Sequence, residues 1–290
     1  MSFYSEIETA ISTALDQPFH IVKRSPLSGG CISEAVRLHG EKTDFFLKQN
    51  SESFLPHFEE EKASLEELAA TGTIRVPRPI CSGLAQNRSY LVLEFVSKGS
   101  PNKSSWAQLG RQLAQLHKIE QPHFGWKRDN TIGRTPQINS VSNDWIQFYR
   151  KYRLGFQIEL ARKNGFDPPQ SSRLLDGLPR FFETYRPAPS LLHGDLWSGN
   201  ASFDSEGNPF VFDPCCYYGD RETDLAFTEF FGGFDAAFYA AYEESLPLDA
   251  GYSQRKTLYN LYHCLNHFNL FGSPYDSQAQ SMTQQLLSLI

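Results

Sequence analysis

The stretch His193-Gly194-Asp195-Leu196-Trp197-Ser198-Gly199-Asn200, HGDLWSGN, follows the apolar pair Leu191-Leu192 and concentrates polar side chains in a pattern that few chemistries use. An aspartate lies two residues after the histidine, and an asparagine lies five residues after that aspartate. A second aspartate, Asp213, comes thirteen residues after Asn200, at the end of the apolar run PFVFD. The combined pattern, H-x-D-x4-N followed by an aspartate at a strand end, matches phosphoryl-transfer sites.

In such sites each of these side chains has a defined task. One aspartate, here Asp195, accepts or orients the proton of the attacking hydroxyl. The asparagine and the later aspartate, here Asn200 and Asp213, supply oxygen ligands to Mg²⁺, which bridges the nucleotide phosphates. Two protein oxygens are enough, because Mg²⁺ completes its shell with phosphate and water.

Hydrolase chemistry explains the stretch less well. A Ser-His-Asp triad would use Ser198, but the sequence around it lacks the Gly-x-Ser-x-Gly elbow. A metal hydrolase would need further histidines and acids nearby, and the chain contains no HExxH motif. A satisfied buried histidine would account for His193 alone, but not for the whole pattern.

Three weaker signals precede this stretch. The pair Gly29-Gly30 separates two predicted strands, and such a turn lets backbone N–H groups approach phosphate oxygens. Lys48 ends an apolar strand, and Glu61 lies in the first turns of the next predicted helix. Taken singly, these residues fit a hairpin, an exposed strand end and a solvated helix face.

The order of these signals is more informative than each one alone. A glycine turn, a strand lysine and a helix glutamate are followed by an apolar strand that ends Leu93-Glu94-Phe95-Val96. Kinase-type nucleotide sites use this order: the lysine holds ATP phosphates and the glutamate orients the lysine. The last strand leads into a hinge whose backbone can bind adenine.

The predicted elements divide the chain into two parts of different character. The first has a helix (3–15), strands (within 20–40, 44–50 and 89–96) and a helix (54–72). The second has helices (105–118, 142–163, 171–185 and much of 222–290) and two small strands within 190–215. We expect an α+β, bilobal protein-kinase-like fold: an N-terminal nucleotide-binding lobe (1–96) with an antiparallel sheet plus helix, a linker (97–104), and a larger, mainly helical lobe (105–290). A cleft between lobes is the natural ligand site.

Composition narrows the partners. The 290-residue chain has 27 Lys and Arg against 33 Asp and Glu, a formal charge of −6, and no run of cations. Nucleic acid is therefore not expected as a partner. The sequence shows no signal peptide or apolar run long enough to cross a membrane. Five irregularly spaced cysteines favour a reducing cytoplasm over a disulfide framework.

With these residues in view, the chain resembles the fructosamine kinase (ketosamine 3-kinase) family, a branch of the kinase-like fold that includes aminoglycoside phosphotransferases and choline kinases. The segments that carry the resemblance are HGDLWSGN, FDPCCYYGDRETDLAF, EEEKASLEELAATGTIRVP and FGWKRDNTIGRTPQINSVSNDWIQFYRKYRLGFQIELA. The HGDL and GN core indicates only a kinase-like phosphotransferase. Trp197 and the run YYGDRETDLA make the resemblance to this family considerably more specific.

The resemblance implies a role for each candidate residue. They are the catalytic base (Asp195), the magnesium ligands (Asn200, Asp213), the phosphate-binding turn and pair (Gly29, Gly30, Lys48, Glu61), the hinge groups for adenine (Glu94, Val96) and the residues supporting the catalytic loop (His193, Asp224). ATP and Mg²⁺ are the implied cofactors.

The resemblance also implies a substrate, a sugar ketoamine on a lysine or small amine, phosphorylated at the sugar 3-hydroxyl so that the sugar is shed. Trp197 could stack on the sugar or meet the ammonium group, although core packing would explain it equally well. Two alternatives stay open: a kinase for another hydroxylated amine, such as an aminoglycoside or amino alcohol, and a nucleotide-binding pseudokinase. The intact lysine, glutamate, aspartates and asparagine argue against the pseudokinase.

Three positions depart from common patterns. Pro214 follows Asp213 where protein kinases have Phe, which argues against a mobile switch there. Cys215 and Cys216 are adjacent, so packing is favoured over a bond between them. Cys31 follows the glycine pair; if it is exposed beside the phosphates, its oxidation or an intermolecular disulfide would block ATP, and the alternative is a small residue that suits a tight loop. That hypothesis predicts oxidant sensitivity that Cys31→Ser removes.

Overall fold

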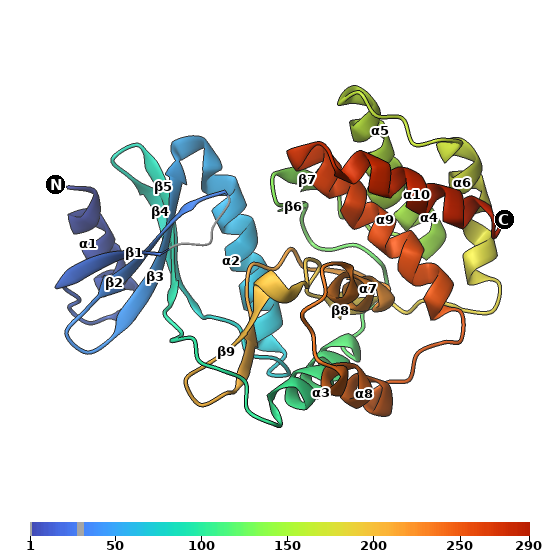
Figure 1. The fold of residues 1–290 in the computed structure, drawn as a ribbon. Helices are drawn as coiled ribbons and strands as arrows, with labels where there is room; N and C mark the ends of the chain where they lie inside the picture. The colour runs from blue at the N-terminus through green and yellow to red at the C-terminus, as the bar shows by residue number, and fades with distance from the viewer. Residues whose placement is uncertain (1, 28–31) are drawn as a thin grey trace.

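The computed structural model describes residues 2–27 and 32–290, and these residues form two lobes (Figure 1). The smaller lobe contains the sheet and the first helices, and the larger lobe is mainly helical. The predicted two-lobed α+β architecture is therefore confirmed. Gly29, Gly30 and Cys31, which carry the predicted phosphate turn and the redox hypothesis, lie outside the described residues.

A five-stranded antiparallel sheet forms the smaller lobe, with strand order β1-β2-β3-β5-β4. In chain order its elements are α1 (Phe3–Leu15), β1 (Lys23–Leu27), β2 (Glu34–His39), β3 (Asp44–Ser51), a 3₁₀ turn (Glu52–Phe54), α2 (Leu55–Ala70), β4 (Pro79–Ala85) and β5 (Arg88–Glu94). The predicted helix 3–15 is confirmed, and strand β4 was not predicted.

The side chains of strand β3 point alternately to the two faces of the sheet. Phe45 and Leu47 are buried in the cluster that also contains Ile7 and Ile11 of α1. Successive side chains of a strand point to opposite faces, so the alternate residues Phe46 and Lys48 face away from α1. Lys48 is one of these, which places its ammonium group on the face of the sheet toward α2.

Helix α2 lies between the sheet and the helical lobe in Figure 1. Its apolar residues Phe58, Leu65 and Leu68 belong to the same buried cluster as the larger lobe. Two glutamates on α2 also bind the larger lobe: Thr131 donates to Glu60 (3.1 Å), and Glu67 accepts from Tyr218 (3.1 Å) and Lys127 (2.7 Å). The helix is therefore fixed to the larger lobe.

The larger lobe combines helices with short strand pairs. Its elements are α3 (Ser105–His117), β6 (Asn130–Ile132), β7 (Thr135–Gln137), α4 (Trp145–Tyr149), a π-helix (Arg150–Leu154), α5 (Gly155–Lys163), α6 (Ser171–Gly177), a 3₁₀ turn (Leu178–Phe182), β8 (Ser190–Leu192), a 3₁₀ turn (Ser198–Asn200), β9 (Ala201–Phe203), β10 (Pro209–Val211), β11 (Tyr217–Gly219), α7 (Glu222–Phe230), α8 (Ala236–Ser245), α9 (Tyr252–Phe271) and α10 (Tyr275–Leu287). Strands β8 and β11 pair, as do β9 and β10, and β6 and β7.

The structure departs from the predicted elements at several points. The predicted helix 142–163 begins later and contains the π-helix 150–154, and the helix predicted over 171–185 ends as a 3₁₀ turn. The hairpin β6–β7 was not predicted, because its strands are three residues long and largely polar, too short for a periodic signal.

The predicted linker is held by hydrogen bonds rather than being free. The N–H of Gly99 donates to the carbonyl of Phe203 in β9 (2.9 Å), so this segment runs beside the larger lobe. Strand β5 ends at Glu94 and α3 begins at Ser105. The domain boundaries at 96/97 and 104/105 stay a prediction. Among the described residues, the helices are too short or too polar for any to cross a bilayer.

Candidate functional site

The loop from His193 to Trp197 follows strand β8 and requires glycine at its second position. Gly194 has a φ of +86°, in the region that side chains rarely adopt. A Cβ atom there would lie 2.2 Å from the carbonyl oxygen of Cys215. Close packing against the segment after Asp213 therefore explains the glycine of HGD.

Asp224, in the first turn of α7, holds this loop through its backbone. Its carboxylate accepts hydrogen bonds from the N–H of His193 (2.7 Å) and of Gly194 (2.9 Å). It also accepts from Nε2 of His117 (3.2 Å), a residue that sequence reasoning missed. Burial alone would raise the pKa of Asp224, but these hydrogen bonds and nearby histidines hold that pKa below its ordinary value.

Both ring nitrogens of His193 bind backbone groups and so stabilise the loop. Its Nε2 lies 3.1 Å from the carbonyl oxygen of Phe212, which can only accept, so Nε2 carries the proton. Its Nδ1 accepts from the N–H of Asp195 (3.3 Å). Burial lowers the pKa of His193, which keeps the ring neutral. Both ring nitrogens are occupied, so His193 has no nitrogen left to act as a base.

Asp195 and Asn200 form a tight pair. The Asn200 amide nitrogen donates to the Asp195 carboxylate and to its carbonyl, both at 2.9 Å. Both donor hydrogens are thus directed at Asp195, and the amide oxygen is left as an acceptor. Burial, together with the negative charge of Asp213, raises the pKa of Asp195 well above its ordinary value.

Lys48 joins the two lobes at the other side of the site. Its ammonium group donates to Glu61 (2.7 Å) and to Asp213 (2.6 Å). Burial by itself would lower the pKa of Lys48, but these two carboxylates raise it above its ordinary value. Asp213 has a left-handed backbone with a φ of +57°, and its side chain is 45% exposed. The predicted lysine, glutamate and aspartate therefore meet.

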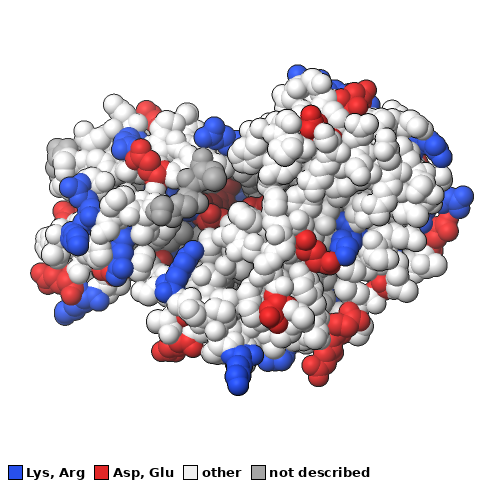
Figure 2. All heavy atoms as spheres, viewed as in Figure 1, with Lys and Arg blue, Asp and Glu red and all other residues white. Residues whose placement is uncertain are grey.

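The oxygen atoms near this junction suit a hard cation. The amide oxygen of Asn200 and the carboxylate of Asp213 are the ligand types that Mg²⁺ prefers. The described residues contain no group of three His, Cys, Asp or Glu that could hold a metal alone. Two protein oxygens fit Mg²⁺, which takes its other ligands from phosphate and water. Figure 2 shows acidic side chains in the hollow between the lobes.

Glu94 and Val96 lie where the sheet joins the larger lobe. The carboxylate of Glu94 accepts from Arg75 (3.1 Å) and from the N–H of Arg78 (3.2 Å), so its side chain is already bound within the lobe. Val96 follows two residues after the end of β5 and is partly buried. Arg37 stacks over the intervening Phe95 ring at 4.1 Å. Any adenine contact at this hinge would use backbone groups.

Trp197, two residues after Asp195, forms an aromatic ledge with Phe231. A Cβ at Gly199 would lie 2.3 Å from the Trp197 ring, so the ring covers that glycine. The ring also packs edge-to-face with Phe231, with ring centroids 5.4 Å apart. Phe231 is 41% exposed and also contacts His267 (5.1 Å). Phe231 and His267 were not predicted, because only the fold brings Phe231 beside Trp197 and His267 beside Phe231.

Comparison with known proteins agrees with this geometry. The sequence profile of the fructosamine kinase family matches residues 3–289. The chain is 46% identical over 287 residues to a "Probable ketoamine kinase" of Synechocystis sp., with 99% of this chain and 97% of that protein covered.

Solved structures give the same result for the fold. A crystal structure from Haemophilus somnus 129PT, named as a candidate fructosamine-3-kinase, superposes with a TM-score of 0.92 at 30% identity, covering 99% of this chain and 98% of that one. Aminoglycoside phosphotransferase APH(4)-Ia, in a ternary complex with AMP-PNP and hygromycin B, gives a TM-score of 0.65 at 14% identity, with 98% of each chain covered, and so shares the fold alone. The fold is kinase-like, and the chain belongs to the fructosamine kinase family of phosphotransferases.

Proposed function

We propose that this protein transfers the γ-phosphoryl group of ATP to a sugar hydroxyl of a ketosamine. The observation that supports this most directly is the meeting of two parts of the chain: Lys48 of the small lobe, which binds Glu61, also binds Asp213, next to the Asp195–Asn200 pair. This is the residue set of a phosphoryl-transfer site. The family membership supports a ketosamine as acceptor.

On the nucleotide side, Lys48 would bind phosphate oxygens and Glu61 would hold the lysine in place. Backbone groups of Glu94 and Val96 would bind adenine. Asn200 and Asp213 would hold Mg²⁺, which when bound neutralises phosphate charge. Gly29 and Gly30 would cover the phosphates.

On the acceptor side, Asp195 would take the proton of the attacking hydroxyl. Asn200 fixes the orientation of its carboxylate, which general-base catalysis requires. The Trp197–Phe231 ledge offers an aromatic surface to a sugar ring or to the ammonium group of the substrate. Burial lowers the pKa of the neighbouring His267, so this ledge stays neutral and does not repel a cation.

The chemistry of the product would follow from the acceptor position. Phosphorylation at the 3-hydroxyl of a ketosamine gives an unstable adduct that sheds the sugar and regenerates the amine. We expect the reaction in the cytoplasm, where the four described cysteines, all free, would stay reduced.

The test is direct turnover. The purified protein, with ATP and Mg²⁺, is assayed on fructosyl-lysine and ribulosyl-lysine and, in parallel, on choline and a panel of aminoglycosides. We expect turnover of a ketosamine and release of free lysine, detected by mass spectrometry. Preferred turnover of an aminoglycoside or choline would contradict the ketosamine proposal. Bound nucleotide without any phosphoryl transfer would favour the pseudokinase alternative.

Asp195→Asn tests the assignment of the base. The variant should bind an ATP analogue nearly as well as the wild type, because Asp195 is not proposed to bind nucleotide. Its kcat should fall by about 10²–10⁴-fold, the usual contribution of a general base. A variant that keeps full activity would show that another group accepts the proton.

A further inference from the structure

The hairpin β6–β7 carries a buried amide cluster that the roles above leave unexplained. Asn130, Gln137 and Asn139 are between 1% and 3% exposed, and none of them lies in the catalytic loop. Burying an amide costs free energy unless it is hydrogen-bonded, and apolar side chains would fill the same space without that requirement. Three amides at one place therefore need a reason beyond packing.

Two of these amides donate hydrogen bonds to backbone carbonyls just after Asp213. The side-chain nitrogen of Asn130 donates to the carbonyl of Cys216 (2.9 Å). The side-chain nitrogen of Gln137 donates to the carbonyl of Cys215 (3.1 Å) and also to the Asn130 amide oxygen (2.8 Å). Because carbonyl oxygens only accept, these contacts fix which end of each amide faces the loop.

The rest of the cluster keeps the two amides in that orientation. Asn139 donates to the amide oxygen of Asn130 (2.9 Å), and Arg153 of the π-helix donates to the amide oxygen of Asn139 (2.6 Å). Tyr262 of α9 donates to the amide oxygen of Gln137 (2.9 Å). Hydrogen bonds of one network strengthen one another in a buried site.

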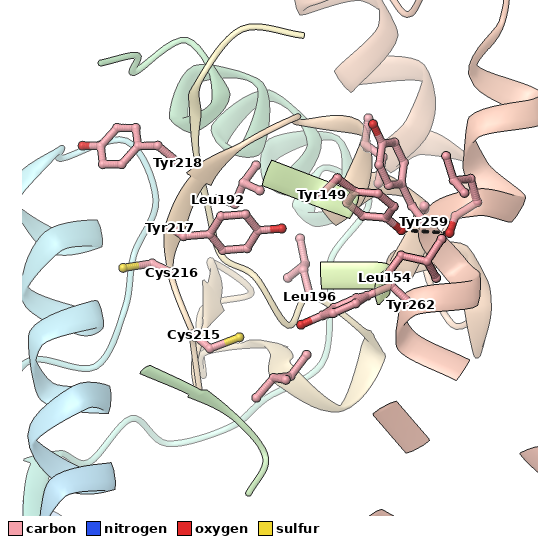
Figure 3. Close-up of a cluster of buried hydrophobic side chains, with 14 of the residues drawn as sticks. Tyr149, Leu154, Leu192, Leu196, Cys215, Cys216, Tyr217, Tyr218, Tyr259 and Tyr262 are labelled. Atoms are coloured by element: carbon pink, nitrogen blue, oxygen red, sulfur yellow. Dashed lines mark hydrogen bonds between the residues drawn. The ribbon is translucent and has the colours of Figure 1, made fainter. Parts of the chain in front are cut away.

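The segment Asp213–Cys216 also contacts the loop from His193 to Trp197. The N–H of Cys215 donates to the carbonyl of His193 (3.0 Å), and the Cys215 carbonyl packs against Gly194. His193 in turn binds the carbonyl of Phe212. Figure 3 shows the Cys215 side chain within the buried cluster that contains Tyr262, while the Cys216 sulfur points the opposite way, toward α2.

The segment Asp213–Cys216 has few means of stabilising its own backbone conformation. Asp213 adopts a left-handed backbone, which is unfavourable for a residue with a side chain. Pro214 has no N–H and cannot donate a hydrogen bond that would close a local turn. External donors must therefore fix the carbonyls that follow.

We propose that Asn130 and Gln137 are positioning residues of the phosphoryl-transfer site. By holding the carbonyls of Cys215 and Cys216, they set the separation between the base Asp195 and the metal ligand Asp213. The proposal rests on the metal-binding role proposed above for Asp213. It makes the hairpin β6–β7 the fixed support for a segment that is mobile in many kinases.

The test compares two buried glutamines. Gln137→Met removes the hydrogen bond to the Cys215 carbonyl and keeps a side chain of similar length. Gln157→Met is the matched control: Gln157 is also 1% exposed, and it binds Asn266 (3.1 Å) and Asn269 (2.8 Å) in the helical lobe. Binding of Mn²⁺ in the presence of AMP-PNP is measured by electron paramagnetic resonance.

We expect Gln137→Met to weaken Mn²⁺ binding by about tenfold, the usual effect of removing a residue that supports a metal ligand. Gln157→Met should bind Mn²⁺ as the wild type does, even if its melting temperature falls equally. Equal weakening in both variants, or none in Gln137→Met, would overturn the proposal.

A second variant and the wild type complete the design. If Gln137→Met does not fold, Asn130→Ser is used instead. It removes the hydrogen bond from the Asn130 amide to the Cys216 carbonyl, and we again expect Mn²⁺ binding to weaken by about tenfold. A wild type that binds AMP-PNP but no Mn²⁺ would contradict the metal role of Asp213 itself. That outcome is distinct from failure of the positioning role, which requires a wild type that binds Mn²⁺.

Discussion

The ammonium group of Lys48 lies 2.6 Å from the Asp213 carboxylate, which joins strand β3 of the small lobe to the segment after β10 across 165 positions of sequence. The same lysine binds Glu61, so one cation is shared by two carboxylates. The proposed phosphate-binding residue and the proposed metal ligand are therefore positioned by each other.

Lys48→Met should lower kcat/KM for ATP by about 10–100-fold, because hydrogen bonds to charged groups contribute about 1.5–3 kcal/mol. Initial rates at varied ATP measure this effect. Lys127→Met is the control, since Lys127 also pairs with a glutamate of α2 (Glu67, 2.7 Å) but is 61% exposed. Similar losses in both variants would mean that Lys48 acts only by holding α2.

The pH dependence of kcat/KM should report the raised pKa of Asp195. Asp195 accepts a proton only when ionised, so activity falls as the pH decreases through its pKa. Since burial and Asp213 raise this pKa, the loss should occur at a higher pH than for an ordinary aspartate. Saturating Mg²⁺ should move the acid limb to lower pH by offsetting the charge of Asp213. A limb that does not respond to Mg²⁺ would contradict this coupling.

Gly194→Ala should destabilise the protein by about 2–5 kcal/mol, the sum of a left-handed backbone and overpacking against Cys215. Gly72→Ala separates these two effects, because Gly72 also has a positive φ (+63°) but nothing within 4 Å of an added Cβ. It should cost only about 1–2 kcal/mol. Urea unfolding measures both variants, and equal losses would show that contact with Cys215 does not matter.

The described cysteines should resist alkylation in the native protein. Burial raises the pKa of Cys81 to about 11 and that of Cys264 to about 12, and it raises those of Cys215 and Cys216 well above the ordinary range. Thiolates are the reactive form, so these four should label slowly at pH 8.

Peptide mapping after brief iodoacetamide treatment measures this. If Cys31 is the redox-sensitive thiol, it alone should be labelled rapidly, and Cys31→Ser should remove both the fast label and the sensitivity of activity to oxidant. Equal oxidant sensitivity in that variant would discard the redox hypothesis.

Much of the site could be predicted from the sequence because its residues are ordered along short motifs. HGDLWSGN contains Asp195 and Asn200, which do bind each other. Lys48 and Glu61 were predicted from their order along the chain, and the structure brings both to one place with Asp213. The prediction that Cys215 and Cys216 pack rather than bond is confirmed, since both are free and buried.

The remaining residues could not be predicted, because their partners are distant and leave no local pattern. His117 lies at the end of α3 and meets Asp224 across 107 positions. Phe231 and His267 meet only where α7 and α9 lie together. Asn130 and Gln137 belong to a segment that resembles the family, but their contacts could not be predicted, because strands of three residues show no periodicity.

The attachment of α2 to the larger lobe bears on how such an enzyme would be controlled. Glu60 and Glu67 are bound to that lobe on either side of Glu61, so the glutamate that meets Lys48 is held in place by the larger lobe. We therefore expect the proposed kinase activity to need no activating modification, because these contacts already hold Glu61 in place. Its rate would then be set by the concentrations of its substrates.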